Sequence, residues 1–571
     1  MKKIIFLLIL ALLSPFYLHS FEQGKYGGII NVTSTKIPKS LNPITSDVID
    51  TTDITNMMFQ GLLKIKMDSY DFEPNFAYFW KTNDTKDIWT FYLRDDLFWS
   101  DGKALTVEDV LFTFKDVIYN PNIASPFKVQ YTIKNKRIEI SAKDNKIIFK
   151  LPYSYSPFPY IIATTPIIPK HIYEKIVQNG KFENALSLDD DPEKMVVNGP
   201  FILEKITKEK AILKRNPKYY RVNIFGDKLP YLDGVIIHFL DSPDLCLLKF
   251  LSGEADIYGL RGGDFRGEDY SVLKPREELD AFKVVNSGAD FASQFLVFNQ
   301  NTKTDPKTGK NYVDPVKLTW FRNKFFRKAI AHATDQGEII LNTMKNFGYH
   351  GTSPLSPSAK KYFNPHVIQY PFNLEKASEY LKKGGFSYRA NSNVLVDSLG
   401  NKVAFNLFTD ISRFQRHKIS AQLVKNLRKL GITVDFTPTA TSDIVHKLWT
   451  SYKWDSIILG LTGEVEPDLV NHYWYSNSNS NIWFPNQIEP STIWEAEIDK
   501  LLRKGSATSD FKERKEIYDK WQYIASDELP MIFTVIPSFM SASRNHVGNY
   551  IPKPSPKYNS LYNIDEIFIR R

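Results

Sequence analysis

A strand–helix–strand unit near the middle of the chain constrains its fold most. Val235–Phe239 is an apolar, β-branched run that predicts a strand. Ser242 and Pro243 predict a helix start, because a serine hydroxyl caps free N–H groups and proline lacks the N–H that the first turn leaves unbonded. Gly253 predicts the end of this helix, and a second strand follows at 255–257. Such a unit favours parallel strands, so we expect an α/β fold with helices on the sheet faces.

The length of the chain predicts more than one lobe. Its 571 residues exceed the roughly 250–300 residues at which a single hydrophobic core stops growing. A composition of 43% hydrophobic and 24% charged residues is ordinary for a folded soluble protein. The net charge of +9 is spread along the chain without a basic block. We therefore expect no nucleic-acid partner, since that function needs a clustered basic patch.

The amino terminus has the pattern of a secretion signal. Lys2 and Lys3 precede an apolar run at 4–13 that is too short to span a bilayer. We expect residues 1–20 to be a signal peptide, with an uncleaved anchor as the alternative. The single cysteine, Cys246, lies far inside the chain, so neither an internal disulfide nor a lipid anchor after signal cleavage is expected.

One segment carries a specific motif, WTFYLRDDLFWSDGKALTVEDVLFTFKDVIYN from Trp89 to Asn120. In it, an alternating strand leads to a turn, and Thr106 caps a helix with apolar residues at helical spacing. This string resembles a signature of the extracellular solute-binding proteins of bacterial ABC importers, family 5, which include peptide, nickel and oligosaccharide receptors. Asn198–Phe201 also resembles that family, as does part of 320–344, a stretch that we expect to be helical.

The resemblance implies a periplasmic-binding-protein-like fold with two α/β lobes, a Venus flytrap, and an extra domain inserted in the first lobe. The expected ranges are lobe I at 21–58, 196–292 and 528–571, the inserted domain at 59–195, and lobe II at 293–527. The implied function is that of a periplasmic protein that captures oligopeptides by hinge closure and delivers them to an inner-membrane ABC permease. We expect a monomer, not lipidated, that is not an enzyme and carries no cofactor.

The main candidate for a ligand contact follows the predicted strand around residues 454–460. In peptide-binding relatives an acid after this strand pairs with the ammonium group of the ligand. Glu464 falls at that position, although Leu461 replaces the usual tryptophan. An ammonium buried in a closed cleft needs an ionised partner, because burying it alone is costly. Asp468 is a second candidate, and a loop acid facing solvent is the alternative for both.

Further candidate contacts are backbone and ring groups. The residues are Asp47, Val48, Ile49, Phe127, Trp449 and Trp454. The first three follow a turn, at a place where relatives line the cleft and where main-chain groups can pair with an extended peptide as an added strand does. A helix cap formed by Asp47 or Asp50 is the alternative there. For the three rings, packing in the core is the alternative to contact with a ligand.

Other ligand and function classes stay open at this point. An oligosaccharide is the alternative ligand, since the changes at Leu461 and Glu464 resemble a branch of the family with sugar receptors, and Ser476–Asn481 offers neutral polar groups. A secreted glycoside hydrolase is a more distant alternative, since it needs only two carboxylates about 5–10 Å apart. The ten histidines show no pair at i and i+4, so we expect no metal site.

Overall fold

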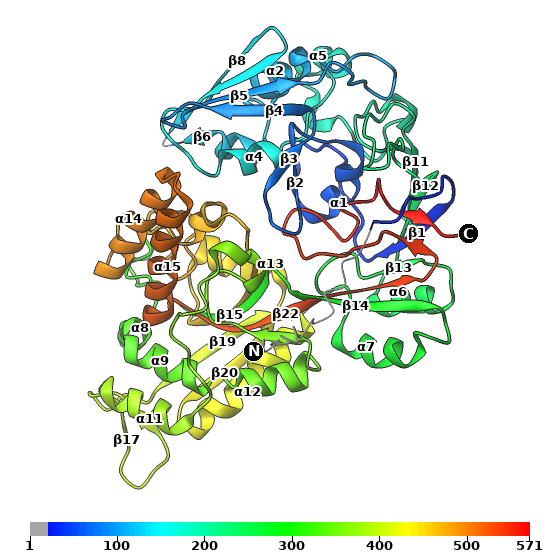
Figure 1. The fold of residues 1–571 in the computed structure, drawn as a ribbon. Helices are drawn as coiled ribbons and strands as arrows, with labels where there is room; N and C mark the ends of the chain where they lie inside the picture. The colour runs from blue at the N-terminus through cyan, green and yellow to red at the C-terminus, as the bar shows by residue number, and fades with distance from the viewer. Residues whose placement is uncertain (1–20, 134) are drawn as a thin grey trace, which may run out of the picture.

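The computed structural model describes residues 21–133 and 135–571. The expected signal peptide, residues 1–20, lies outside this range. In the described part of the chain, no helix is long and apolar enough to cross a membrane. The fold is α/β, as the strand–helix–strand unit predicts, and consists of two lobes and an inserted domain (Figure 1).

One large sheet forms the centre of both lobes. Its main path has the strand order β10-β11-β12-β1-β13-β22-β15-β21-β19-β20, and β14 and β16 also pair with β22. The bounds are β1 (Ile29–Ser34), β10 (Phe201–Ile206), β11 (Lys210–Arg215), β12 (Gly234–Phe239), β13 (Ile257–Tyr258), β14 (Phe282–Ala289), β15 (Ala292–Phe298), β16 (Gly348–His350), β19 (Ala404–Asp410), β20 (Thr433–Thr439), β21 (Ser456–Thr462) and β22 (Met531–Arg544).

Lobe I contains β1 and β10–β14, with helices α1 (Ile49–Met58), α6 (Pro243–Leu251) and α7 (Gly267–Leu273). The expected strand–helix–strand unit is confirmed as β12, α6 and β13, and β1 lies between the two strands, parallel to both. The hydroxyl oxygen of Ser242 accepts a hydrogen bond from the N–H of Leu245 at 3.3 Å. This cap begins α6 directly after the strand, so the helix packs back onto the sheet.

Lobe II contains β15, β16 and β19–β21, and β19 is parallel to both β20 and β21. Its helices are α8 (Pro315–Arg322), α9 (Lys324–Ala333), α10 (Gln336–Glu338), α11 (Leu374–Lys383), α12 (Phe414–Lys429), α13 (Thr441–His446), α14 (Ile493–Ala507) and α15 (Phe511–Glu528). Aromatic and aliphatic side chains from the sheet and from α8, α9, α11 and α12 form a core of their own. Other lobe II side chains, among them Trp474, Trp483 and Trp521, belong to a larger core that also includes lobe I and the inserted domain.

The inserted domain has a separate sheet with the order β4-β5-β9-β8. Its elements are β4 (Ala77–Thr82), β5 (Ile88–Leu93), β8 (Glu139–Lys143), β9 (Lys146–Lys150), α2 (Val107–Phe112), α3 (Phe127–Gln130), α4 (Phe158–Thr164) and α5 (Lys170–Gln178). The expected cap at Thr106 is confirmed as a capping box with Asp109. A two-stranded sheet of β2 (Leu63–Ile65) and β3 (Phe72–Pro74) also lies in the predicted insertion. The exact domain boundaries stay a prediction.

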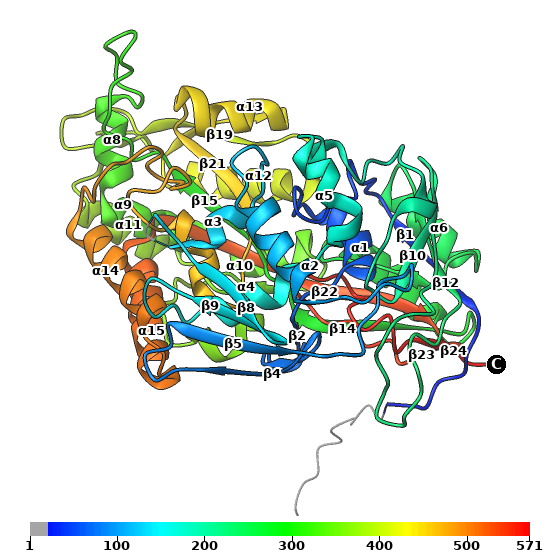
Figure 2. The same cartoon turned by 90° about the horizontal axis from the view of Figure 1, so that it is seen from above.

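Two neighbouring segments connect the lobes. One is the short link between β14 and β15, where the backbone N–H of Asp290 donates to the carbonyl of Pro537 at 2.8 Å. The other is β22 itself, which pairs with β13 and β14 in lobe I and with β15 and β16 in lobe II. Figure 2 shows β22 running between the two groups of elements. Two adjacent connections of this kind suit a hinge motion.

The buried carboxyl group of Asp290 in this link makes a pH-dependent contribution to stability. Desolvation raises its pKa from the ordinary 3.8 to about 6. The folded protein therefore binds this proton more tightly than the unfolded chain, so stability is lost as pH rises from about 4 through about 6. Asp290→Asn lacks this titration. Between pH 4 and pH 7 the free energy of unfolding of the variant should therefore fall by about 2 kcal/mol less than that of the wild type. Denaturant titrations at both pH values measure this, and identical pH dependence in the two proteins contradicts it.

Candidate functional site

A groove with about 670 Å³ of empty space, partly open to solvent, lies where lobe I meets the inserted domain. Its lining comes from the turn before α1, from α1 itself, from the region of α3 and α4, and from the carboxyl-terminal segment of lobe I. The lining residues include Pro43, Ser46, Asp47, Ile49, Thr52, Thr55, Asn56, Phe127, Gln130, Thr164, Pro556, Lys557 and Tyr558. Most of the polar groups are neutral hydroxyls and amides. The two charged residues in the lining, Asp47 and Lys557, have opposite signs.

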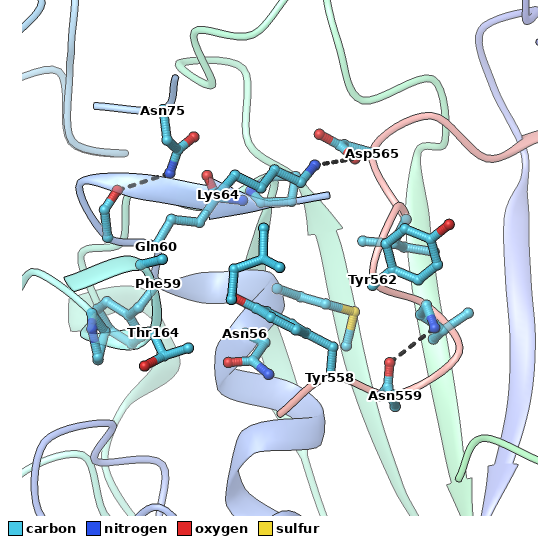
Figure 3. Close-up of a pocket in the computed structure, with 18 of the residues that line it drawn as sticks. Asn56, Phe59, Gln60, Lys64, Asn75, Thr164, Tyr558, Asn559, Tyr562 and Asp565 are labelled. Atoms are coloured by element: carbon cyan, nitrogen blue, oxygen red, sulfur yellow. Dashed lines mark hydrogen bonds and ion pairs between the residues drawn. The ribbon is translucent and has the colours of Figure 1, made fainter. Parts of the chain in front are cut away.

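A second cavity of about 760 Å³ adjoins the groove between α1, β2 and the carboxyl-terminal segment. Both cavities are lined by Asn56, Phe59, Thr164 and Tyr558. Figure 3 shows Asn56, Thr164 and Tyr558 on one side of this cavity and Lys64 with Asp565 on the other. The two spaces therefore adjoin each other along the boundary between lobe I and the inserted domain.

Glu464 follows β21 and lies where all three bodies meet. Its Oε1 atom is 3.0 Å from the Nζ atom of Lys557 in lobe I. Its Oε2 atom accepts a hydrogen bond from the hydroxyl of Tyr160 in α4, at 3.3 Å. Burial raises the pKa of Tyr160, so its hydroxyl stays a donor, and the Glu464 carboxylate raises the pKa of Lys557. With only 12% of its side chain exposed, Glu464 is a partly buried carboxylate that already binds an ammonium group.

Three of the other predicted contacts lie together at the groove. Asp47, Ile49 and Phe127 all belong to its lining, although the Phe127 ring is only 6% exposed and also packs in the core. Val48 is 53% exposed, and its carbonyl accepts hydrogen bonds from the first N–H groups of α1. No side chain caps α1, so the alternative of a cap by Asp47 or Asp50 is wrong. The turn before α1 and the first residue of the helix thus present one acid, Asp47, and one apolar side chain, Ile49, to the groove.

Asp468, which we expected at the ligand, lies instead in a buried network inside lobe II. Its side chain is fully buried, and its Oδ2 atom is 3.1 Å from Nη2 of Arg514 and 2.9 Å from the hydroxyl of Tyr518. Arg514 also binds Glu466, and it donates a hydrogen bond to the hydroxyl oxygen of Tyr362 at 2.6 Å. Burial, with Glu466 close by, raises the pKa of Asp468. Asp468 is therefore part of the interior of lobe II rather than of the groove.

The two predicted tryptophan contacts lie apart from the groove lining. Trp454 is 3% exposed and packs in the hydrophobic core next to β21. This agrees with the alternative of core packing. Trp449 is 37% exposed, in the short helical segment Lys447–Ser451 of lobe II. Its ring is accessible, but neither cavity described above includes it.

Glu464 and Lys557 form the ion pair of the site. Within residues 21–133 and 135–571, no group of three or more His, Cys, Asp or Glu side chains is placed to hold a metal ion. Glu464 is bound by an ammonium group and a phenol instead. The arrangement therefore supports reversible binding through ion pairs and hydrogen bonds.

The sequence interpretation missed the partners of Glu464. Lys557 lies in the segment Pro554-Ser555-Pro556-Lys557-Tyr558, in which two prolines restrict the backbone. These two prolines could have indicated that the loop has a fixed conformation. Tyr160 carried no signal of its own, because its role depends on the inserted domain meeting lobe II.

Comparisons with known proteins agree with this architecture. The family model for bacterial extracellular solute-binding proteins, family 5 (middle), matches residues 71–483. The "Probable ABC transporter-binding protein" of Deinococcus radiodurans is 25% identical, over 94% of this chain and 91% of that protein. The oligopeptide-binding protein AppA of Bacillus subtilis is 24% identical, over 97% of this chain and 93% of its own.

Solved structures share the fold. The structure of AppA from Bacillus subtilis in complex with a nonapeptide has a TM-score of 0.72 and 22% identity, covering 96% of this chain and 100% of that one. MelB from Agrobacterium fabrum, in complex with stachyose, has a TM-score of 0.73 and 19% identity, covering 96% of this chain and 85% of that one. Relatives with one fold thus hold different ligands. On the match to the family model, the chain belongs to the bacterial extracellular solute-binding proteins, family 5.

Proposed function

We propose that this protein is the substrate-binding component of an ABC importer for oligopeptides. It closes two lobes over a peptide and presents the closed form to an inner-membrane permease. The observation that carries the proposal is the ammonium group already bound at Glu464, because a site that holds one ammonium has the charge and geometry to hold that of a peptide. The peptide-binding relative AppA supports the same ligand class.

The groove offers the remaining contacts. We propose that Asp47, Ile49 and Phe127 line the path of the peptide and that Val48 contributes main-chain groups from the same turn. Main-chain pairing with an extended peptide fixes its direction without reading its sequence. The protein acts by binding and release, as a monomer in the periplasm, after removal of residues 1–20 and without a lipid anchor.

An oligosaccharide is the second candidate ligand, for a specific reason. Ser46, Thr52, Thr55, Asn56 and Gln130 give the groove a series of neutral hydroxyl and amide groups. Sugars are bound through such groups and through aromatic faces, and Tyr558 supplies a ring there. The relative MelB, solved with stachyose, supports this alternative.

Native mass spectrometry of the protein purified from its own cells separates the two candidates. We expect it to carry peptides, which denaturation releases for sequencing. Glu464→Gln removes the charge that holds the ammonium group and should weaken peptide binding about tenfold. Released sugars in place of peptides would overturn the proposal in favour of the second candidate. Peptide binding that Glu464→Gln leaves unchanged would refute the role of Glu464 alone.

A further inference from the structure

A tight turn between β11 and β12 of lobe I holds apolar side chains out in solvent. Val222 and Lys228 form an antiparallel bridge, and residues 223–227 make the turn between them. Ile224 at its tip is 85% exposed, Val222 59% and Phe225 45%. Figure 2 shows the connection between β11 and β12 projecting from the molecule beside the amino-terminal segment. Single exposed apolar residues are ordinary, but three at one projecting turn indicate a contact surface.

The backbone of this turn is fixed by its own hydrogen bonds. The side-chain oxygen of Asn223 accepts from the N–H groups of Phe225 and Asp227, both at 2.9 Å. The N–H of Gly226 donates to the carbonyl of Asn223 at 3.1 Å, and its φ of +85° suits a glycine. The hydroxyl of Tyr231 donates to the Asp227 carboxylate at 2.7 Å. The apolar side chains are therefore held in solvent by a built turn rather than by a loose loop.

The amino-terminal segment lies against this turn and adds a ring. Phe21 is 40% exposed and lines, together with Ile224 and Phe225, a hollow with about 990 Å³ of empty space that is partly open to solvent. The hydroxyl of Tyr26 donates to the carbonyl of Lys228 at 2.7 Å and so fixes the segment to the turn. We call the side chains of Phe21, Val222, Ile224 and Phe225 together the apolar tip.

Lysines lie at the edge of the apolar tip, and the acids of this region face cations of the protein. Lys25 in the amino-terminal segment and Lys228 in the turn are exposed. Among the acids that line the hollow, Glu22 pairs with Arg570 at 2.7 Å, Asp68 with Lys553 at 2.9 Å and Glu566 with Arg221 at 3.7 Å, and Glu73 lies opposite Lys64 in the β2–β3 pair. Apolar side chains with lysines at their edge complement an anionic lipid surface, because its headgroups attract cations and its acyl region accepts apolar groups.

We propose that the apolar tip is a membrane-contact site, which inserts Ile224 and Phe225 into the interface of an anionic phospholipid bilayer. Lys25 and Lys228 then lie at the level of the headgroups. The tip belongs to lobe I, so its contact with lipid does not involve lobe II. The inference goes beyond the proposed function and does not depend on the ligand of the groove. It gives a protein for which we propose no lipid anchor a way to stay at the membrane.

Flotation with vesicles of phosphatidylglycerol and phosphatidylcholine measures the partition of the protein into lipid. Ile224→Ser combined with Phe225→Ser should lower the partition coefficient about tenfold, because two apolar side chains no longer enter the interface. All variants share one amino terminus, so residues 1–20, removed or kept, do not contribute to the difference. A double variant that binds these vesicles as the wild type does would overturn the proposal.

Leu399→Ser is the matched control for the double variant. Leu399 is 83% exposed in a turn of the same construction, in which the side-chain oxygen of Asp397 accepts from the N–H groups of Leu399 and Asn401 at 3.0 and 2.9 Å. This control also removes an exposed apolar side chain from a fixed turn, but at a distant place in lobe II. It should bind the vesicles as the wild type does. An equal loss in the control would contradict a specific role of the apolar tip.

The charge of the lipid tests the lysines. Lys228→Gln should lower the partition into the anionic vesicles about fivefold and should leave the weaker partition into pure phosphatidylcholine unchanged. If the lysine substitution abolishes binding while the double serine variant binds normally, the protein is adsorbed through its charge alone, and insertion of the apolar tip is refuted.

A local probe separates insertion from adsorption. Ile224→Cys can be labelled with the environment-sensitive dye nitrobenzoxadiazole, since Cys246, the single natural cysteine, is buried. The emission of the dye should rise when anionic vesicles are added, whereas the same dye at Leu399→Cys should not respond. Equal responses at the two positions would overturn the insertion. A dimer that forms without lipid and that the double serine variant loses in sedimentation would show that the tip joins two copies of the chain instead.

Discussion

Replacing Arg514 by methionine is expected to lower the free energy of unfolding by about 3–5 kcal/mol. Arg514 is the cation between Glu466 and Asp468, and all three side chains are less than 10% exposed. Without it, two carboxylates lie close together in the interior with no cation, and their desolvation is no longer offset. Denaturant-induced unfolding, followed by tryptophan fluorescence, measures the loss.

A triple variant is the control for this prediction. Arg514→Met combined with Glu466→Gln and Asp468→Asn removes every charge of the network while keeping similar volumes. Replacing a buried ion network as a whole is often close to neutral, so the triple variant should recover most of the lost stability. If the triple variant is as unstable as Arg514→Met alone, packing rather than unpaired charge explains the loss.

Trp483→Ala should have an effect of similar size, about 3–5 kcal/mol, for a different reason. The Trp483 ring is completely buried beside Trp474 and Trp494, with ring centroids 5.5 and 5.8 Å away. Its Nε1 atom donates to Glu495 at 3.0 Å. Alanine leaves a cavity and removes a hydrogen bond from a buried carboxylate.

The same substitution at an accessible ring is the matched control. Trp449 is 37% exposed, and Trp449→Ala should change the free energy of unfolding by no more than about 1 kcal/mol. Thermal unfolding of both variants compares the two positions directly. If the two variants lose similar free energies of unfolding, burial of the ring does not determine its contribution to stability.

Several elements of the fold could be predicted from short stretches of sequence. The helix starts at Ser242 and Thr106 could be predicted because capping depends on neighbouring residues only. The stretch 320–344 is less simple than expected, since α8 ends and α9 begins at Asn323. The side-chain oxygen of Asn323 accepts from the N–H groups of Phe325 and Phe326 and caps a new helix. The apolar periodicity on both sides hides such a break.

Only part of the candidate site could be predicted from the sequence. The motif after β21 indicated Glu464, and the turn before α1 indicated Asp47 and Ile49. Lys557 and Tyr160 could not be assigned, because they reach Glu464 only after lobe I, lobe II and the inserted domain have come together. Asp468 was misplaced for the same reason, since its partner Arg514 lies on α15, far along the chain. Tertiary contacts between distant segments leave no local pattern.

The shared strand β22 also sets the order of events during synthesis. Residues 531–544 pair with β13 and β14 on one side and with β15 and β16 on the other, so each lobe lacks part of its sheet until nearly the whole chain has left the ribosome. Contacts of such long sequence separation form slowly. The large sheet of both lobes is therefore completed only after the carboxyl-terminal residues 531–544 have been made, whereas the separate sheet β4-β5-β9-β8 of the inserted domain contains no strand from that end of the chain.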